Sequence, residues 1–227
     1  MTSVELPPPP PPQPKTPQEP PESLEQPPSI TTAIPNAPPD LPSHLAISPI
    51  TTPNQLSQFR RINTLLLPIR YPDSFYNAIL SPAQLSSLSL IATYTPQSPS
   101  PPVVVGGICC RLEDREAPGR QDGSNSEPTT TTTKQRQLYI LTLCILAPYR
   151  RLGLASHLLE QMISRALVAE DGVSDVYAHV WEANEEARRW YSRRGFGEEE
   201  GRVEGYYRRL KPQGAVVVRR NVRIGVI

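Results

Sequence analysis

One continuous stretch, residues 138–159, constrains the fold of this chain more than any other. It reads LYILTLCILAPYRRLGLASHLL. The residues from Leu138 to Ile145 are apolar, aromatic or β-branched, which predicts a mostly buried strand. Pro148 has no backbone N–H to donate, so it predicts the end of that strand, and an apolar helix follows through Ile163. The stretch therefore predicts a strand, a turn and a helix, the repeating unit of an α/β domain.

The turn inside this unit, Arg150–Ala155, is the first candidate binding site. Its pattern Arg-x-x-Gly-x-Ala places two cations and two small residues where a helix begins. The first turn of a helix has free N–H groups that can bind an anion, and small residues allow the anion to approach the backbone. The pattern favours a pyrophosphate site, although a solvated basic turn would look the same in sequence.

Further strands and helices are expected to alternate around this unit. The residue pattern predicts strands at 45–48, 86–94, 103–112, 174–181, about Phe196 and at 206–210, and helices at 51–67, 74–80 and 182–194. Asp73 is expected to cap the second helix and Gly195 to end the last one. The resulting order, β-α-α-β-β-β-α-β-α-β-β, predicts a mixed sheet with helices on both faces.

Proline separates an N-terminal tail from the domain. Eighteen of the 29 prolines lie in residues 1–53, and a proline-rich segment forms neither a regular helix nor a strand ladder. We expect a disordered tail over 1–40, a domain over 41–212 and a C-terminal extension over 213–227. Polar residues with a threonine run predict a disordered loop insertion at 113–135.

Composition narrows the function classes. The formal net charge of +1 indicates neither nucleic-acid nor membrane binding. The three cysteines lie in apolar runs without metal-ligand spacing, so we expect buried reduced thiols and no metal. No apolar run reaches transmembrane length. These features favour a cytoplasmic protein, with the nucleus as an alternative location.

The Arg150–Ala155 pattern resembles the acetyl-CoA signature of the GNAT acetyltransferases. Three longer segments, LPIRYPDSFY at 67–76, LYILTLCILAPYRRLG at 138–153 and HVWEANEEARRWYSRRGF at 179–196, together with Tyr206 and Tyr207, resemble the San-type N-terminal acetyltransferases, the catalytic subunits of NatE. The resemblance covers about residues 45–212. It implies the GNAT fold, an α/β (α+β) architecture whose mixed sheet splits at the acetyl-CoA site.

The resemblance also implies a set of site residues. It places the catalytic pair at Tyr139 and His179, on strands that flank the split. The residues implied for acetyl-CoA binding are Leu143, Cys144, Ile145, Arg150, Arg151, Leu152, Gly153, Leu154, Ala155, Ser156, Asn184, Ala187, Tyr191 and Arg193. Those implied for the peptide are Leu67, Pro68, Ile69, Tyr71, Arg111, Tyr139, Leu141, His179, Tyr206 and Tyr207. Leu67 and Leu141 stand where the family usually has Phe and Met.

The expected function is acetyl transfer from acetyl-CoA to the α-amino group of proteins that begin with Met and an apolar residue. His179 has an ordinary pKa suited to a base acting through water, whereas Tyr139 needs a lowered pKa or orients the water. Two alternatives remain: an acetyltransferase for lysine or a small amine, and a weakly catalytic subunit that docks on the NatA complex. The expected partners are nascent or mature protein N-termini and NatA at the ribosome.

Overall fold

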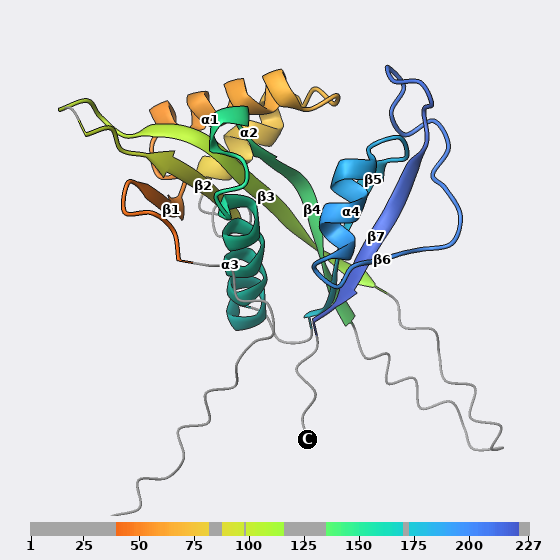
Figure 1. Cartoon of the computed structure of the whole chain (residues 1–227). Coiled ribbons are helices and arrows are strands. Elements are labelled where there is room, and N and C mark those ends of the chain that lie inside the picture. Colours follow the sequence, from red (N-terminus) through yellow and green to blue (C-terminus); the bar gives the residue numbers. More distant parts are fainter. Residues whose placement is uncertain (1–39, 82–87, 98, 116–134, 170–172, 223–227) are drawn as a thin grey trace, which may run out of the picture. The chain divides into compact units, whose positions relative to one another are not determined.

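Seven strands form one mixed sheet in the computed structural model (Figure 1), which describes residues 40–81, 88–97, 99–115, 135–169 and 173–222. The strand order is β1-β2-β3-β4-β5-β7-β6. The strands are β1 (Leu45–Pro49), β2 (Ser89–Tyr94), β3 (Val103–Arg115), β4 (Gln135–Ile145), β5 (Val173–Trp181), β6 (Gly197–Glu198) and β7 (Ala215–Asn221). β4 and β5 pair in parallel, and the other neighbours are antiparallel. The mixed sheet expected from the sequence is confirmed.

Within the described ranges, four α-helices cover the two faces of this sheet. They are α1 (Pro53–Leu66), α2 (Asp73–Leu80), α3 (Leu154–Ala169) and α4 (Glu185–Ser192), with a short 3₁₀ turn, η1, at Ala147–Tyr149. The side chains of α1 and α2 pack in one core cluster, and those of α3 and α4 pack in the other. This arrangement confirms the prediction of helices on both faces.

The N-terminus of α1 is capped by a side chain, whereas that of α2 is not. Thr52 caps α1 in a reciprocal box: its Oγ1 accepts from Gln55 N at 3.2 Å, and Gln55 Oε1 accepts from Thr52 N at 3.1 Å. The prediction that Asp73 caps α2 is wrong, because Asp73 is the first helical residue and no side chain caps the helix. Its carboxylate instead pairs with Arg60 at 2.5 Å, which joins α2 to α1.

The first core cluster fixes α1 and α2 on the sheet. Phe59, Ile62 and Ile79 are buried against residues of β2, β3 and β4. Phe59 reaches the sheet above Gly107, where an added Cβ would lie 2.7 Å from the Phe59 ring and from the carbonyl oxygen of Leu90. A glycine is therefore required on β3 for this close approach.

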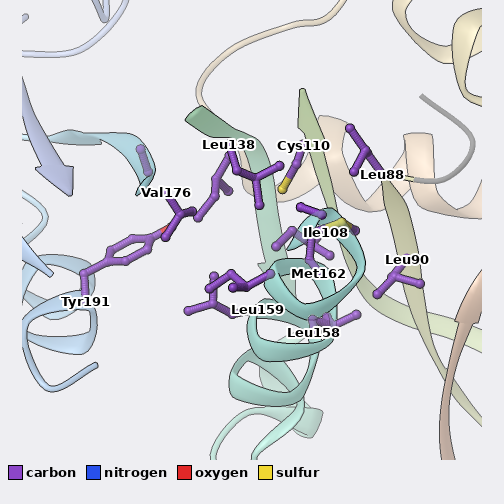
Figure 2. Close-up of a cluster of buried hydrophobic side chains, with 14 of the residues drawn as sticks. Leu88, Leu90, Ile108, Cys110, Leu138, Leu158, Leu159, Met162, Val176 and Tyr191 are labelled. Atoms are coloured by element: carbon purple, nitrogen blue, oxygen red, sulfur yellow. The ribbon is translucent and has the colours of Figure 1, made fainter. Parts of the chain in front are cut away.

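The second core cluster fixes α3 on the opposite face. Figure 2 shows Leu158, Leu159 and Met162 of α3 among side chains of β2, β3 and β4, with the Tyr191 ring of α4 directed toward Val176 of β5. Cys110 belongs to this cluster, whereas Cys109 and Cys144 belong to the α1–α2 side. All three cysteines are buried free thiols, as expected from the sequence.

The sheet opens between β4 and β5. Their parallel pairing runs from Arg136 and Val173 to Ile140 and Ala178, and no pair beyond it joins the described parts of the two strands. The two halves of the sheet spread apart from this point (Figure 1). On its other side β4 bulges, because Ile140 and Thr142 face consecutive residues of β3 and leave Leu141 without a partner position. The split expected from the resemblance is confirmed.

Two boundaries differ from the prediction around the hairpin of β3 and β4. β3 continues to Arg115 and β4 begins at Gln135, so residues 113–115 and 135 belong to paired strands and not to a disordered loop. The rest of the expected loop, residues 116–134, lies outside the described residues, as do the tail 1–39 and the start of the predicted strand at 86–87.

The C-terminal part of the fold also corrects the prediction. Residues 206–210 form turns and not a strand, and the helix expected at 182–194 is limited to Glu185–Ser192. The final long strand is β7, which lies between β5 and β6 in the sheet. Residues 215–221 are therefore part of the sheet and not an extension beyond a domain end at residue 212.

Within the described residues no helix is long and apolar enough to span a membrane.

Candidate active site

The turn between β4 and α3 has an unusual backbone. Arg151 has φ 65° and Gly153 has φ 82°, both in the left-handed region. α3 begins immediately afterwards at Leu154. Backbone N–H groups of the five residues from Arg151 to Ala155 find no acceptor among the described residues. The turn thus presents a set of free donors at a helix N-terminus, the arrangement that binds phosphate groups.

Side chains hold this turn from two sides. Arg150 Nε donates to the carbonyl oxygen of Ile145 at 3.0 Å, so the first cation of the motif fastens the turn to the end of β4. Arg194 donates from Nε and Nη2 to Ser156 Oγ at 3.0 and 2.5 Å. Arg194 also stacks over the Trp190 ring, with Cζ 3.9 Å from the ring centroid. Neither Arg194 nor Trp190 was singled out from the sequence.

The other residues expected to bind acetyl-CoA lie at the end of β4 and on α4. Leu143 is partly exposed on β4, whereas the side chains of Cys144 and Ile145 are buried in the two cores, which leaves only their backbone groups for a ligand. Asn184 is the N-cap of α4, because its Oδ1 accepts from Ala187 N at 3.1 Å. Tyr191 is buried, and burial raises the pKa of its phenol. Arg193 is exposed.

The two residues expected to handle the proton are in direct contact. Tyr139 of β4 and His179 of β5 lie just where the strands separate, and His179 Nδ1 is 3.1 Å from Tyr139 Oη. Tyr139 Oη is also 2.7 Å from Tyr206 Oη. The imidazole of His179 stacks on the Tyr206 ring, with centroids 4.5 Å apart and an interplanar angle of 9°. Three side chains from three segments thus form one hydrogen-bonded cluster.

The pKa values of Tyr139 and His179 shift in opposite directions. Burial, followed by the hydrogen bond to Tyr206, raises the pKa of Tyr139 well above its ordinary value. Tyr139 is therefore a neutral phenol that donates and accepts hydrogen bonds, and the lowered pKa considered for it as a base is not found. Burial lowers the pKa of His179, against smaller opposing effects of Glu113 and Glu199. A neutral imidazole is the form that can accept a proton.

The residues expected to form a peptide groove border this cluster. Tyr71, from the α1–α2 loop, donates to the carbonyl oxygen of the bulged Leu141 at 2.6 Å. Tyr207 donates to the carbonyl oxygen of His179 at 3.0 Å. Leu67 and Leu141 are partly buried against the α1–α2 core, Ile69 is partly exposed, and Pro68 is exposed. Arg111 of β3 lies over the Tyr139 ring, with Cζ 5.5 Å from the ring centroid.

Two neighbours of this cluster, Tyr177 and Glu113, are not among the site residues expected from the sequence. Tyr177 stacks on Tyr139, with ring centroids 4.7 Å apart and an interplanar angle of 15°. Glu113 accepts a hydrogen bond from Tyr177 Oη and pairs with Arg111. The position of Tyr177 two residues before His179 puts both on one face of β5, a signal that was available. Glu113 was hidden because the strand was predicted to end at Leu112.

In the part of the chain that the structure describes, no three His, Cys, Asp or Glu side chains gather as metal ligands.

Comparisons with known proteins agree with this geometry. Residues 58–196 match the model of the Acetyltransferase (GNAT) family. The chain is 31% identical to N-alpha-acetyltransferase 50 of Danio rerio over 173 residues, which are 76% of this chain and 86% of that protein. It is 33% identical to the probable N-acetyltransferase san of Drosophila melanogaster over 173 residues, which are 76% of this chain and 78% of that protein.

Solved structures similar to this chain include N-alpha-acetyltransferases. Arabidopsis thaliana Naa50 in complex with the bisubstrate analogue CoA-Ac-MVNAL is similar with a TM-score of 0.59 and 26% identity, over 79% of this chain and 99% of that one. Arabidopsis thaliana NAA60 in complex with acetyl-CoA shares the fold, with a TM-score of 0.61 and 22% identity over 78% of this chain and 99% of that one. The chain therefore belongs to the GNAT acetyltransferase family, and within it to the N-alpha-acetyltransferases of the Naa50 and San group.

Proposed function

We propose that this chain transfers the acetyl group of acetyl-CoA to the α-amino group of proteins that begin with Met followed by an apolar residue. One observation carries the proposal: the Tyr139–His179–Tyr206 cluster lies where β4 and β5 separate, and β4 leads through η1 into the turn with free N–H groups. One relative of known structure, Arabidopsis thaliana Naa50, was solved with an analogue that joins CoA to an acetylated peptide beginning with Met.

The turn supplies the cosubstrate site. Free N–H groups from Arg151 to Ala155 bind the pyrophosphate of acetyl-CoA, and the exposed Arg150 and Arg151 add positive charge. The open edge of β4 beyond Ile140 has backbone groups without a β5 partner. Backbone N–H groups near Leu143 polarise the thioester carbonyl and stabilise the oxyanion that forms during attack.

The chemistry of the amine favours an α-amino group over lysine. The pKa of an α-amino group is about 7.7–8.0, whereas that of a lysine amine is about 10.4. At pH 7.4 roughly a quarter of the former is neutral, against about one part in a thousand of the latter. Deprotonating lysine therefore costs about 3–4 kcal/mol more. A neutral imidazole such as His179 is a sufficient base for the α-amine but a weak one for lysine.

The transfer step uses the cluster as a unit. The neutral amine attacks the thioester carbonyl carbon, a C–N bond forms, and the C–S bond breaks with its electron pair leaving on sulfur. A water held by Tyr139 passes the surplus ammonium proton to His179, and Tyr191 protonates the departing thiolate. His179 then releases its proton to solvent and Tyr191 takes one proton back, so both side chains end the cycle neutral. The products are the acetylated N-terminus and CoA. Tyr139 stays neutral throughout because its pKa is raised.

Recognition of the first residue is assigned to apolar side chains. Leu67, Ile69 and Leu141 line the position proposed for the Met side chain, next to the exposed Pro68. Tyr71, Tyr206 and Tyr207 supply hydroxyl groups beside the peptide backbone, and Arg111 lies over the Tyr139 ring at the same edge. An apolar pocket with polar groups at its mouth suits an uncharged first side chain.

A peptide panel tests this function. Acetylation rates are measured for peptides beginning Met-Leu, Met-Glu, Ser-Ala and Ala-Ala, and for a peptide with a blocked N-terminus and one internal lysine. We expect the highest kcat/KM for Met-Leu and the lowest for the lysine peptide. Equal rates on the lysine peptide and on Met-Leu would contradict the proposal and favour a lysine acetyltransferase.

We also propose, on the resemblance to the NatE catalytic subunits, that the chain docks on the NatA complex in the cytoplasm. Co-purification of the tagged chain with the NatA auxiliary subunit is the expected result. Recovery of the active chain as a free monomer at physiological protein concentrations would contradict the docking.

A further inference from the structure

Four side chains form a row across four strands next to the catalytic pair. Arg111 of β3 pairs in register with Tyr139 of β4, Tyr139 with Tyr177 of β5, and Tyr177 with Arg219 of β7. The contacts follow the register: a guanidinium over the Tyr139 ring at 5.5 Å, the two tyrosine rings stacked at 4.7 Å, and the Arg219 guanidinium over the Tyr177 ring at 4.7 Å. Tyr139 is therefore held in a stack that extends well beyond the site.

Glu113 joins two members of this row. Its Oε2 accepts from Tyr177 Oη, and its Oε1 accepts from Arg111 Nε at 3.0 Å. The carboxylate thus spans from β3 to β5 across the position of Gln137 on β4. Tyr177 stacks on Tyr139 and Arg111 lies above it, so Glu113 fixes two of the groups that contact the ring of Tyr139 from the neighbouring strands, beside His179.

Arg219 anchors the other end of the row. Its Nη1 donates to Gln137 Oε1 at 2.9 Å and pairs with the buried carboxylate of Asp175, and its Nε pairs with Glu199. A guanidinium with three oxygen-bearing partners holds one orientation over Tyr177. An arginine paired with at least one carboxylate therefore lies at each end of the stack. Neither arginine can move without breaking several hydrogen bonds.

We propose that Glu113 is a positioning residue for acetyl transfer, which holds Tyr177 and Arg111 against Tyr139 so that the Tyr139 hydroxyl meets His179 and the acceptor amine. The inference rests on the proposed function, because it assigns Glu113 a role in orienting that catalytic pair. Glu113 itself contacts neither His179 nor any group assigned to the substrate amine.

The charge of Glu113 has a second consequence for His179. Burial lowers the pKa of His179, and the negative charges of Glu113 and Glu199 oppose that lowering, while Arg219 adds to it. Among the residues that the structure describes, the titratable and charged groups around the imidazole are Glu113 with its partner Arg111, Tyr139, Tyr177, Glu199, Tyr206, Tyr207 and Arg219. Removing the Glu113 charge should therefore lower the pKa of His179 further and leave it neutral to a lower pH.

The test combines kinetics with direct titration of His179. In Glu113→Gln, we expect kcat at pH 8 to fall about 5- to 30-fold, since a misplaced catalytic hydroxyl weakens proton transfer, with KM for acetyl-CoA unchanged. We expect the acid limb of the pH–kcat profile, and the pKa of the His179 imidazole followed by NMR, to move down by about half a pH unit. A purely structural loss would not move the acid limb downward.

Asp114→Asn is the matched control. Asp114 is the next carboxylate on β3, but it pairs with Arg136 at 3.3 Å and is exposed. We expect neither kcat nor the pKa of His179 to change in this variant. Tyr177→Phe keeps the stacked ring and removes only the hydrogen bond to Glu113, so its kcat should fall while the protein stays folded.

Three results would overturn the inference: an unchanged kcat in Glu113→Gln, an unchanged pKa of His179 in that variant, or the same changes in Asp114→Asn. The NMR titration needs no substrate. A shifted pKa in a chain that acetylates no peptide supports the contact network and refutes the proposed function, so the two failures are distinguishable.

Discussion

The proposed cosubstrate turn, Arg151–Ala155, and the proposed acceptor cluster, Tyr139 with His179 and Tyr206, are both connected to β4, but they are built from different chemical groups. Arg151–Ala155 offers backbone N–H groups and is shaped by two left-handed residues. The acceptor cluster is made of side chains from β4, β5 and the segment between β6 and β7, joined by hydroxyl and imidazole contacts of 2.7 and 3.1 Å. The turn depends on backbone conformation, whereas the cluster depends on single polar atoms.

This difference predicts how each region responds to substitution. A turn built of N–H groups tolerates a change of side chain but not a change that alters φ or fills the space above it. A cluster built of hydroxyl groups and an imidazole tolerates small backbone adjustments but loses function when one atom is removed. Binding of acetyl-CoA and the rate of transfer should therefore be separable by mutation.

The largest effect is expected at Gly153. Gly153→Asp introduces a side chain and a negative charge at φ 82° against the proposed pyrophosphate position, so acetyl-CoA binding should be abolished. Calorimetric titration with acetyl-CoA measures the loss. Gly201→Asp is the control, because Gly201 has φ 88° and open space around it, so it carries the same backbone strain away from the turn. Undiminished affinity in Gly153→Asp would refute the assignment of the turn.

The proposed catalytic pair, Tyr139 and His179, should show the opposite pattern: variants should lose rate and keep their affinity for acetyl-CoA. Tyr139→Phe removes the hydrogen bonds to His179 and Tyr206 but keeps the stack on Tyr177. We expect Tyr139→Phe and His179→Ala each to lower kcat by about 10²-fold, the low end for a general base, because the α-amine is already partly neutral. The affinity for acetyl-CoA should be nearly unchanged.

The double variant sharpens this prediction. If Tyr139 and His179 act through one water, the fold-decrease in kcat of the double variant should be smaller than the product of the two single decreases. Raising the pH should partly rescue His179→Ala, because solvent then supplies more neutral amine. If either single variant keeps the wild-type kcat from about pH 6.5 to 9 on a Met-Leu peptide, that residue has only a structural role.

A smaller effect is expected at Tyr206. Tyr206→Phe removes the 2.7 Å contact with Tyr139 but leaves the ring stacked on His179. Loss of one hydrogen bond of about 0.5–1.5 kcal/mol predicts roughly a 2- to 10-fold fall in kcat. Steady-state kinetics with the Met-Leu peptide measure it. A fall as large as that of Tyr139→Phe would show that Tyr206 is itself part of the proton path.

The smallest effect concerns stability at low pH. Burial lowers the pKa of His179 in the folded protein below its ordinary value of 6.5, so the unfolded chain binds more protons as the pH falls through 6.5. The free energy of unfolding should decrease from there down to the folded pKa and then level off, with no contribution from His179 above pH 6.5. The free energy of unfolding of the wild type and of His179→Gln is measured by urea unfolding between pH 5 and 8. The decrease below pH 6.5 that comes from His179 should be present in the wild type and absent in His179→Gln.

The same difference between the two regions explains what could be predicted from the sequence. The turn is a contiguous segment between a strand and a helix, so its residues and its place in the fold followed from local pattern. The pair Tyr139 and His179 was placed through a family resemblance, and the structure brings the two into contact. The roles of the site residues remain predictions for the experiments above.

What escaped prediction depends on long-range pairing. β7 is a run of four apolar residues followed by two arginines and an asparagine, and only its position between β5 and β6 shows that Arg219 belongs beside Tyr177. Glu113 reaches Tyr177, 64 positions later in the chain, through the paired hairpin of β3 and β4. Sheet register links residues far apart in sequence, and no local pattern in a single sequence reveals such a link.

The place of β7 has a consequence for biosynthesis. A ribosome completes the cosubstrate turn well before it adds β7, which pairs with β5 along its whole length and follows the segment that carries Tyr206. Until β7 emerges, β5 is an unprotected edge and His179 has no stacking partner held in place. A chain stopped after Leu210 would keep the turn, but it would have no assembled acceptor site and would expose a strand edge prone to aggregation.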